Sequence, residues 1–452
     1  MNLPGQTDET IVALSTPPGR SAIGVIRLSG PTAHDLLSRF FQPRAPNTSR
    51  LARYGRFLDG PDTIDDVVTT TYTAPHSYTG EDMVEISAHG NPLVLGRIIT
   101  ALIAGGARRA EPGEFTLRAV GNGRMDLGQA EAIRDFIAAQ TDRQARTARL
   151  QMEGGLSRRI GPSREQLLGI VAELEAAIDF AEDDVPLPSG LDLAARVRPI
   201  AEVMARLAGS YEFGRVLSVG ALLAVAGKPN VGKSSIFNRL VDSDRAIVTE
   251  VAGTTRDVLT ETIMVAGIPV RFADTAGLRV TADRVEALGV DRTLETMAEA
   301  DLTLVVLDSA RPLDAEDDAV LARARKGPHV LAANKSDLPP AWDLARFPDA
   351  VRLSAVTGEG VAGLRQRIED HLVDGRPEGA DDLVITSLRQ RDALDAATAK
   401  LRASATALEA GTPHEMVLVD LYAAISSIGE LTGDVTTDDI LDRVFSTFCI
   451  GK

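Results

Sequence analysis

The sequence predicts a multi-domain protein that combines α/β units with an all-α part. Residues 9–120 mix strand-like and helix-like runs, residues 221–373 alternate strands with helices, and helical sequence lies on both sides of 221–373. A chain of 452 residues has room for two to four domains, each able to bury a core. The expected fold is an N-terminal α/β or α+β domain and a discontinuous helical domain, with a doubly wound α/β domain inserted into the latter.

The N-terminal part should form a small sheet with helices. Runs rich in Val, Ile and Thr predict strands in ETIVALS, AIGVIRLSG, DVVTTTYT and DMVEISAHG. Helical periodicity appears in PTAHDLLSRFF and NPLVLGRIITALIA. We therefore expect an α/β or α+β domain over residues 1–122.

From Asp126 the pattern becomes helical. DLGQAEAIRDFIAAQTDRQARTARLQME has apolar residues at helical spacing and no Pro or Gly after Gly128, so one continuous helix is expected. Two more helical stretches, REQLLGIVAELEAAIDFAE and LAARVRPIAEVMARLAGSYEFGRVL, complete the segment 123–219. Helices also fill 376–452, and together the two segments are expected to form one discontinuous domain.

Residues 220–375 should form the inserted domain. Strand-like runs such as ALLAVAG, PVRFADTAG, DLTLVVLDS and PHVLAANKS alternate with helix-like runs such as KSSIFNRLV. This alternation predicts a parallel, doubly wound sheet.

Composition and charge narrow the class of protein. The hydrophobic content of 44% and charged content of 25% are ordinary for a globular protein, and a single cysteine excludes an internal disulfide. No signal peptide and no run of about 18 apolar residues is visible, so a cytoplasmic protein without membrane association is expected.

The net charge of −16 argues against a nucleic-acid partner, but the charge is unevenly placed. Residues 1–164 hold 19 arginines, no lysine and 17 acids. The arginine-rich stretch 143–164 is either a solvated helix face or an edge that contacts phosphates.

The strongest motif is GKPNVGKSS at 227–235, which follows the apolar strand ALLAVA and opens a helix. This is the context of a phosphate-binding P-loop: Gly227 and Gly232 permit the tight turn, and backbone N–H groups at the helix start cradle phosphate. Lys233 is expected to reach the β and γ phosphates, and Ser234 to offer its hydroxyl to Mg²⁺.

Three further motifs follow in order. DTAG at 274–277 ends a strand, and we expect Asp274 near Mg²⁺ and the Gly277 N–H near the γ phosphate. GTTRD at 253–257 supplies Thr255 as a second Mg²⁺ ligand. NKSD at 334–337 places Asp337 to accept hydrogen bonds from guanine, and SAV at 354–356 closes over the base. Together these motifs predict a GTP-binding domain.

Two residues distinguish this domain from a Ras-like switch. Ras-like proteins place a Gln after DTAG to orient the attacking water, whereas Leu278 stands here and has no polar group. Arg279, Asp283 and Glu286 are the nearby candidates for that task. Asn230, inside the P-loop, can ligate a monovalent cation that offsets transition-state charge.

These motifs resemble one family closely, the MnmE (TrmE) family of tRNA modification GTPases. The resemblance covers nearly the whole chain. It rests on TPPGRSAIGVIRLSG, SYTGEDMVEIS, EPGEFTLRAVGNGRMDLGQAEAI, GKPNVGKSS, VAGTTRD, DTAGLR and the ending CIGK.

The resemblance implies an N-terminal domain that dimerises and binds a tetrahydrofolate derivative (5-formyl- or 5,10-methylene-tetrahydrofolate). It also implies a discontinuous helical domain that carries the inserted P-loop GTPase domain. Such proteins are homodimers whose potassium-stimulated G domains pair. With the FAD protein MnmG, in a heterotetramer, they add an aminomethyl or carboxymethylaminomethyl group at C5 of the wobble uridine, uridine 34, of certain tRNAs.

The family's site residues carry over by motif. Glu286 matches the catalytic glutamate, and Ser234 and Thr255 would bind Mg²⁺. Asn230, Thr249, Val251 and Thr254 would surround K⁺. The folate contacts would be Arg27, Glu85, Arg124 and Lys452; many members have Lys at the position of Arg124. The residues expected around GTP are Asn230, Val231, Gly232, Lys233, Ser234, Ser235, Thr249, Glu250, Val251, Ala252, Gly253, Thr254, Thr255, Asp274, Thr275, Ala276, Gly277, Asn334, Lys335, Asp337, Ser354, Ala355 and Val356.

The ending FSTFCIGK holds the only cysteine, Cys449. Phe445 and Phe448 have helical spacing and can anchor the tail. In the family this ending reaches the folate pocket, so Cys449 and Lys452 are expected at the modification site. The thiol can act there as an acid, a base or a nucleophile.

Plainer interpretations remain for several residues. Arg27 and Glu85 can form a structural ion pair, and Glu286 can be a solvated helix residue. The six histidines show no close metal-ligand spacing, so no zinc site is expected. Two other classes of function stay open: a ribosome-assembly GTPase like Era or Der, although no KH-like ending or second P-loop is visible, and a regulatory switch without chemistry of its own.

Overall fold

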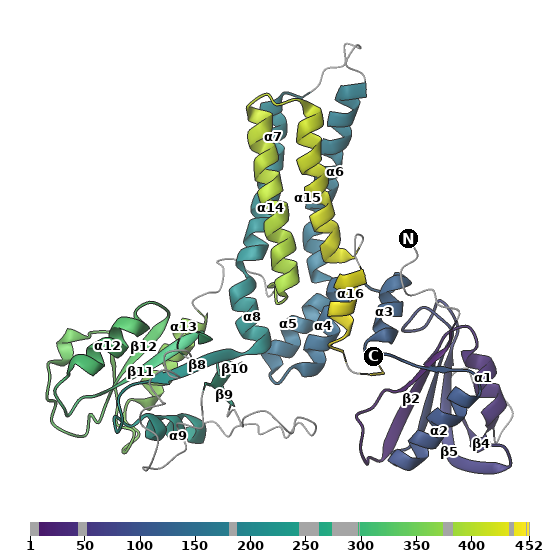
Figure 1. The fold of residues 1–452 in the computed structure, drawn as a ribbon, viewed down its shortest axis with the longest axis horizontal. Helices are drawn as coiled ribbons and strands as arrows, with labels where there is room; N and C mark the ends of the chain where they lie inside the picture. Colours follow the sequence, from purple (N-terminus) through teal and green to yellow (C-terminus); the bar gives the residue numbers. More distant parts are fainter. Residues whose placement is uncertain are drawn as a thin grey trace. The chain divides into compact units, whose positions relative to one another are not determined.

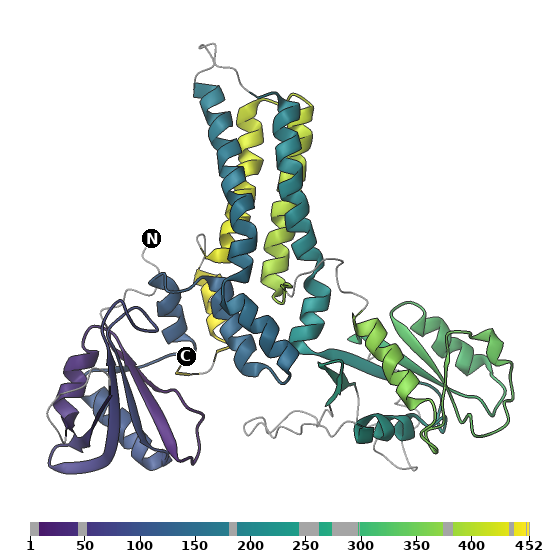
Figure 2. The same ribbon diagram turned by 180° about the vertical axis from the view of Figure 1, so that it is seen from behind.

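The structure, a computed structural model, describes residues 9–43, 52–179, 188–243, 262–273, 297, 299–373, 383–433, 438–448 and 450–451. It divides into two compact units, drawn from opposite sides in Figures 1 and 2. Unit 1 comprises Met1–Arg134, Gln151–Ile200 and Ala399–Lys452, and unit 2 comprises Asp135–Leu150 and Ala201–Thr398.

Unit 1 begins with a seven-stranded sheet in the order β3-β4-β5-β6-β2-β1-β7. Neighbouring strands are antiparallel except for β1 and β7, which are parallel. The strands are β1 (Ile11–Leu14), β2 (Ile23–Ser29), β3 (Phe41–Pro43), β4 (Ala52–Asp59), β5 (Asp62–Tyr72), β6 (Met83–His89) and β7 (Arg108–Arg109). The four strands that the sequence predicts form here; β3, β4 and β7 were not predicted.

Helices α1 (Ala33–Phe40) and α2 (Pro92–Ala104) cover one face of this sheet. Successive strand residues point to opposite faces, so Ile26 and Leu28 join the core beneath these helices. Arg27, which lies between them, therefore faces the other side of the sheet. That face is the one that carries the polar site described below.

The remaining helices of unit 1 include α3 (Glu114–Gly121), most of α4 (Leu127–Ala138), α6 (Gly155–Asp179), α15 (His414–Thr432) and α16 (Asp438–Phe445). The helices α7 (Gly190–Gly209) and α14 (Leu388–Glu409) each run from one unit into the other. Within unit 1, side-chain bonds connect α6, α7, α14 and α15 into a bundle (Figure 1). These bonds are Arg196–Glu173, Arg198–Glu409, Lys400–Asp420 and Tyr422–Glu175.

The expectation of one continuous helix over 126–153 is wrong, because the segment forms α4 and then α5 (Asp142–Met152). The Gln144 N–H donates to Thr141 Oγ1 at 3.0 Å, and Gln144 Oε1 accepts from the Thr141 N–H at 3.2 Å. This reciprocal cap starts a new helix, and its sequence pattern, Thr-x-x-Gln, was readable. The stretch 193–217 also divides into two helices, at Ser210, after which α8 (Tyr211–Val219) begins; there the Ser210 hydroxyl donates back to the Leu207 oxygen and does not cap α8.

Unit 2 contains a six-stranded sheet in the order β13-β12-β11-β8-β10-β9. Its strands are β8 (Ala221–Ala226), β9 (Thr262–Val265), β10 (Ile268–Phe272), β11 (Leu302–Asp308), β12 (His329–Asn334) and β13 (Val351–Arg352). The predicted parallel arrangement holds for all strands but β9, which pairs antiparallel with β10. A two-residue turn joins β9 and β10, with Ala266 at φ 52° and Gly267 at φ 75°, and so tight a turn permits only antiparallel pairing.

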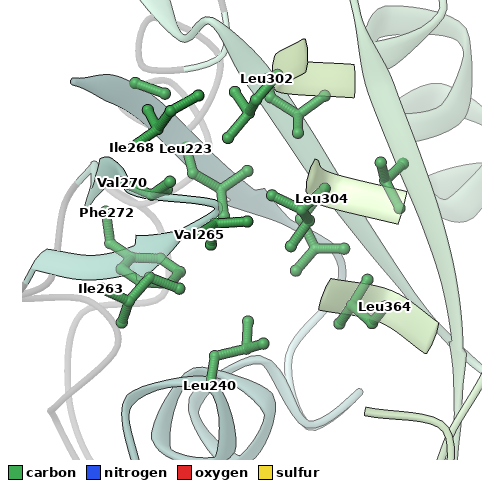
Figure 3. Packing of buried hydrophobic residues seen from close by; sticks show 14 of the residues in the cluster. Leu223, Leu240, Ile263, Val265, Ile268, Val270, Phe272, Leu302, Leu304 and Leu364 are labelled. Carbon is green, nitrogen blue, oxygen red and sulfur yellow. The ribbon is translucent and has the colours of Figure 1, made fainter. Parts of the chain in front are cut away.

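Helices cover both faces of this sheet. Core residues of α8, α9 (Lys233–Ser243) and α13 (Val361–Val373) pack together with alternate residues of β11, and Figure 3 shows Leu240 and Leu364 beside the strand residues. On the opposite face, α12 (Ala315–Ala324) packs on Val305 and Leu307, near the short helix η1 (Leu344–Arg346). In the described part of the chain, no helix has both the length and the apolar character needed to span a bilayer.

Candidate functional site

The P-loop follows β8 at the carboxyl edge of the unit 2 sheet. Gly227 has φ 147° and Gly232 has φ 99°, which favours glycine at both positions. A Cβ on Gly227 would lie 2.4 Å from the Val306 oxygen, and one on Gly232 would lie 2.2 Å from Asn334 Nδ2. The loop is therefore built for close backbone approach, which is the condition for cradling phosphate by N–H groups.

Lys233 begins α9 and folds back over the loop. Its ammonium donates to the carbonyl oxygens of Gly227 at 2.6 Å and Lys228 at 2.8 Å. Burial lowers the pKa of Lys233, because the charged form loses hydration. A cation held by neutral carbonyls beside a helix N-terminus creates a site that favours an anion. Ser234, the next residue, is half-buried at the same point.

The predicted base-recognition motifs meet this loop. Asn334, at the end of β12, donates from Nδ2 to the Val231 oxygen at 2.8 Å and accepts from the Ala355 N–H at 3.0 Å. One buried amide thus ties the P-loop, the NKSD motif and the SAV motif together. Asp337 and Val356 are exposed, with Val356 at 74%, whereas Ser354 is fully buried.

Two positioning residues were not predicted from the sequence. Asp308, at the end of β11, holds the Lys335 ammonium at 2.5 Å, and Lys335 has φ 67°. Arg239 of α9 donates from Nε to the Ala355 oxygen at 2.9 Å and from a terminal nitrogen to the Val356 oxygen at 2.6 Å. Only the spatial proximity of the SAV loop gives Arg239 this role, so no local pattern could have revealed it.

The remaining predicted residues of the nucleotide site, and several others, lie outside the described residues. They are Thr249, Glu250, Val251, Ala252, Gly253, Thr254, Thr255, Asp274, Thr275, Ala276, Gly277, Glu286, Cys449 and Lys452.

A second polar site lies in unit 1. Arg27 of β2 and Glu85 of β6 are direct register partners and form an ion pair at 2.7 Å. Tyr72 donates to the same carboxylate at 3.3 Å, and burial together with the Glu85 charge raises the pKa of Tyr72. The Arg27 guanidinium also lies over the rings of Tyr78, at 5.2 Å, and Phe115, at 5.8 Å.

The loop that carries Tyr78 brings Arg124 to this neighbourhood. A Cβ on Gly80 would lie 3.2 Å from Arg124 Cγ, so the exposed Arg124 side chain runs along this loop. Asn122 anchors the loop by donating from Nδ2 to the Thr79 oxygen at 2.8 Å.

A buried arginine also contacts the loop that carries Tyr78. Arg118 of α3 is fully buried and contacts Glu81 at 3.2 Å and Glu114 at 3.0 Å. Glu81 also accepts from Ser29 Oγ at 2.7 Å. The motifs SYTGED and EPGEFTLRA therefore form one network, in which Arg118 is a positioning residue that the sequence did not single out.

The end of the chain approaches the same sheet. Ile450 pairs with Pro112, and the Gly451 oxygen accepts from Ser15 Oγ at 3.1 Å. Gly451 has φ 97°, and a Cβ there would lie 2.3 Å from the Leu14 oxygen. Upstream, Phe445 and Phe448 are buried in a cluster with α4, as the predicted anchor requires.

Two described residues of the P-loop region offer oxygen ligands for the expected metal ions. The half-buried Ser234 hydroxyl at the helix start suits Mg²⁺, and the exposed Asn230, held at φ 64°, presents an amide oxygen suited to K⁺. No group of three or more His, Cys, Asp or Glu that could hold a metal occurs among the described residues.

A family model described as the MnmE helical domain matches residues 127–449, and one described as the GTP-binding protein TrmE N-terminus matches residues 10–124. A tRNA modification GTPase MnmE from Koribacter versatilis is 45% identical, over 98% of this chain and 99% of that protein. Another, from Aquifex aeolicus, is 41% identical over 98% and 100%.

Among solved structures, the G domain of the T. maritima FeoB iron transporter is 23% identical. The match covers 33% of this chain and 98% of the FeoB chain, with a TM-score of 0.25.

Proposed function

Because this chain belongs to the MnmE family of tRNA modification GTPases, we propose that it couples GTP hydrolysis to modification of the wobble uridine. The chain is a GTPase. With the FAD protein MnmG it would add an aminomethyl or carboxymethylaminomethyl group at C5 of uridine 34, using a tetrahydrofolate one-carbon donor. The observation that carries the proposal is the presence of two distinct polar sites, a P-loop in unit 2 and the Arg27–Glu85 site in unit 1.

For hydrolysis, the described residues position the nucleotide. Loop N–H groups and Lys233 would bind the β and γ phosphates, where the ammonium would exchange its two carbonyl partners for phosphate oxygens. Ser234 and Thr255 would hold a Mg²⁺ ion, which would neutralise charge at the phosphates. Asp337 would accept from guanine, while Lys335, fixed by Asp308, would lie against the base.

The attacking water needs a polar group, and Leu278 offers none. We assign that task to Glu286. A K⁺ ion near Asn230, Thr249, Val251 and Thr254 would offset charge on the phosphates when two G domains pair in the homodimer.

The modification site is assigned to unit 1. Arg27, Glu85 and Arg124 would bind the folate, whose glutamate carboxylates suit guanidinium donors and whose pterin ring suits a carboxylate acceptor. Gly451 lies beside Leu14, the last residue of the strand next to β2, and beside Ser15, which follows it; this placement supports assigning Lys452 and Cys449 to the same site. Tyr54 and Val68, which are register partners and large exposed side chains, lie on this sheet and support pairing of two N-terminal domains.

The domain boundaries 1–122, 123–219, 220–375 and 376–452 remain part of the proposal, as does a cytoplasmic location. A ribosome-assembly GTPase is not favoured, because the two matched family models together cover residues 10–124 and 127–449.

The test separates the two sites. In cells that carry only a variant chain, the nucleosides at the wobble position are measured by mass spectrometry, and GTP turnover is measured on the purified protein. Cys449→Ser should abolish modification and leave GTP turnover near wild type. Glu286→Ala should lower kcat roughly 10²-fold or more with little change in nucleotide affinity. Normal tRNA modification by Cys449→Ser would show that the thiol has no essential chemical role. If Glu286→Ala lost GTP binding as much as kcat, Glu286 would be a structural residue.

A further inference from the structure

A cavity of about 460 Å³ lies in unit 2, at the amino end of β12. Its lining includes Arg325, just after α12, and Arg367 and His371 of α13. These helices cover opposite faces of the sheet. Residues from both faces therefore line the cavity, which lies at the end of the sheet. His329 begins β12 and Asn334 ends it, which separates the cavity from the base-recognition motif by roughly 16 Å of strand.

The lining is strongly basic in an acidic protein. Arg325, Arg346, Arg367, His329 and His371 contribute to it, whereas Asp349 is the one acid among its lining residues. The whole chain has a net charge of −16. Three guanidinium groups around one cavity repel each other, and a cleft lined by one sign of charge concentrates the field that attracts the opposite sign.

The arginines are only weakly neutralised by their neighbours. Arg367 approaches Asp349 at 3.5 Å, but the Asp349 side chain is 89% exposed. Arg346 pairs with Asp318 at 3.2 Å, and both side chains are more than half exposed. Exposed pairs of this kind contribute about 0–1 kcal/mol, so a better acceptor can replace the carboxylate at little cost.

The histidines are oriented so that one nitrogen stays available. Nδ1 of His329 lies 2.9 Å from the Gly327 oxygen, and Nδ1 of His371 lies 2.9 Å from the Arg367 oxygen. Each Nδ1 must therefore carry the proton and donate to its carbonyl. Protonation of a ring would then add an Nε2–H donor.

The cavity also has an apolar wall. Val330, Leu331, Phe347 and Pro348 line it, and the Arg346 guanidinium lies over the Phe347 ring at 5.4 Å. Planar guanidinium donors bind phosphate in a bidentate manner, and the apolar side chains beside them limit competition from water. A cavity of this size holds more than one phosphate group.

We propose that this cavity binds phosphate groups, and that RNA supplies them through its backbone. The RNA source rests on the proposed function in tRNA modification, whereas the phosphate chemistry rests on the cavity alone. The contact would anchor RNA to the G domain at the end of the sheet opposite the nucleotide.

A simpler explanation is that these cations only compensate helix dipoles. Arg325 is the C-cap residue of α12, and His371 lies in the last turn of α13, where positive charge is favourable. Arg346, however, belongs to neither helix. If the cations only compensated helix dipoles, replacing them would lower the stability of the protein and leave its anion binding unchanged.

The test uses the full-length protein loaded with GDP, so that the P-loop is filled. The variant Arg346→Gln/Arg367→Gln removes two cavity charges and leaves only exposed acids behind. The control Arg323→Gln/Arg391→Gln removes two charges from the same unit outside the cavity. Binding of an unmodified tRNA transcript is measured from 50 to 200 mM KCl, and inorganic pyrophosphate is titrated by calorimetry.

The cavity variant should weaken tRNA binding about tenfold at low salt and reduce the slope of log K against log salt by about 2, one for each lost phosphate contact. Its pyrophosphate heat should disappear, whereas the control and the GTPase rate should match wild type. If the cavity variant lost the pyrophosphate heat but kept its tRNA affinity, the cavity would bind phosphate, but RNA would not be the source of the phosphate groups. Unchanged binding of both ligands would overturn the site, and failure of wobble modification with intact tRNA binding would instead count against the proposed function.

Discussion

At the residue scale, Gly232 decides whether the P-loop can form. A side chain there combines a φ of 99° with a Cβ only 2.2 Å from Asn334 Nδ2. Gly232→Ala should introduce strain of roughly 1–3 kcal/mol and displace Asn334 from the Val231 oxygen. We expect GDP affinity, measured by calorimetry, to fall at least about tenfold. Gly363→Ala is the control, because its Cβ meets only Val351 at 3.7 Å; equal affinities for the two variants would contradict this account.

Arg239 acts at the same scale by holding the backbone that closes over the base. Its two donors reach the oxygens of Ala355 and Val356. Arg239→Ala should free this loop and raise the GDP dissociation rate by about tenfold, since bonds from a charged donor contribute about 1.5–3 kcal/mol before solvent exposure reduces them. Stopped-flow release of a fluorescent GDP measures the rate. Arg352→Ala, at another exposed arginine, should leave it unchanged, and a wild-type rate for Arg239→Ala would refute the role.

At the scale of elements, α3 supports the loop between β5 and β6. Arg118→Met would leave the Glu81 and Glu114 carboxylates without their buried partner, which costs about 3–5 kcal/mol. We expect the first unfolding transition in denaturant to shift to lower concentration and amide exchange over residues 77–82 to accelerate. Arg109→Met, at an exposed position of β7, is the control. Unaltered exchange in that loop would show that α3 does not position it.

The same network makes this element sensitive to acid. Burial alone would raise the pKa of Glu114, but hydrogen bonds from Arg108, the Glu111 N–H and Arg118 outweigh it and lower the pKa below its ordinary value of 4.5. The stabilisation is therefore fully present above about pH 4.5 and is lost as the pH falls through the lower folded-state pKa. Glu114→Gln should flatten the loss of stability below pH 4.5 in urea titrations. A slope identical to wild type would place the acid sensitivity elsewhere.

At the scale of the whole molecule, the G domain depends on helices outside its motifs. Phe213, Val216 and Leu217 of α8 and Val384 lie in the core of unit 2. A fragment of residues 210–386 should therefore melt well above a fragment of 220–375 when both are loaded with GDP. Burial of each such side chain contributes about 1.5–3 kcal/mol, and a shift of several degrees per kcal/mol is expected for a domain of this size. Equal melting temperatures would mean that α8 adds nothing to the core.

The sequence by itself determined the class of each unit and the location of the P-loop. Glycines at 227 and 232, a flanking apolar strand and a following helix specify that loop through local backbone geometry, which a sequence pattern records directly. Most strands of both sheets were also predicted, because runs rich in Val and Ile indicate buried strands. The break in the helix at Thr141 was also encoded locally, in a cap that the apolar periodicity obscured.

Only the tertiary structure decided which distant residues meet. Arg239 reaches a loop more than 100 residues away, Arg118 joins Glu81 to Glu114, and three arginines from different segments converge on one cavity. Such contacts depend on how strands and helices pack, and packing energy is spread over many side chains without a local pattern. The division of the chain into two units follows the same rule, because compactness is a property of contacts between segments.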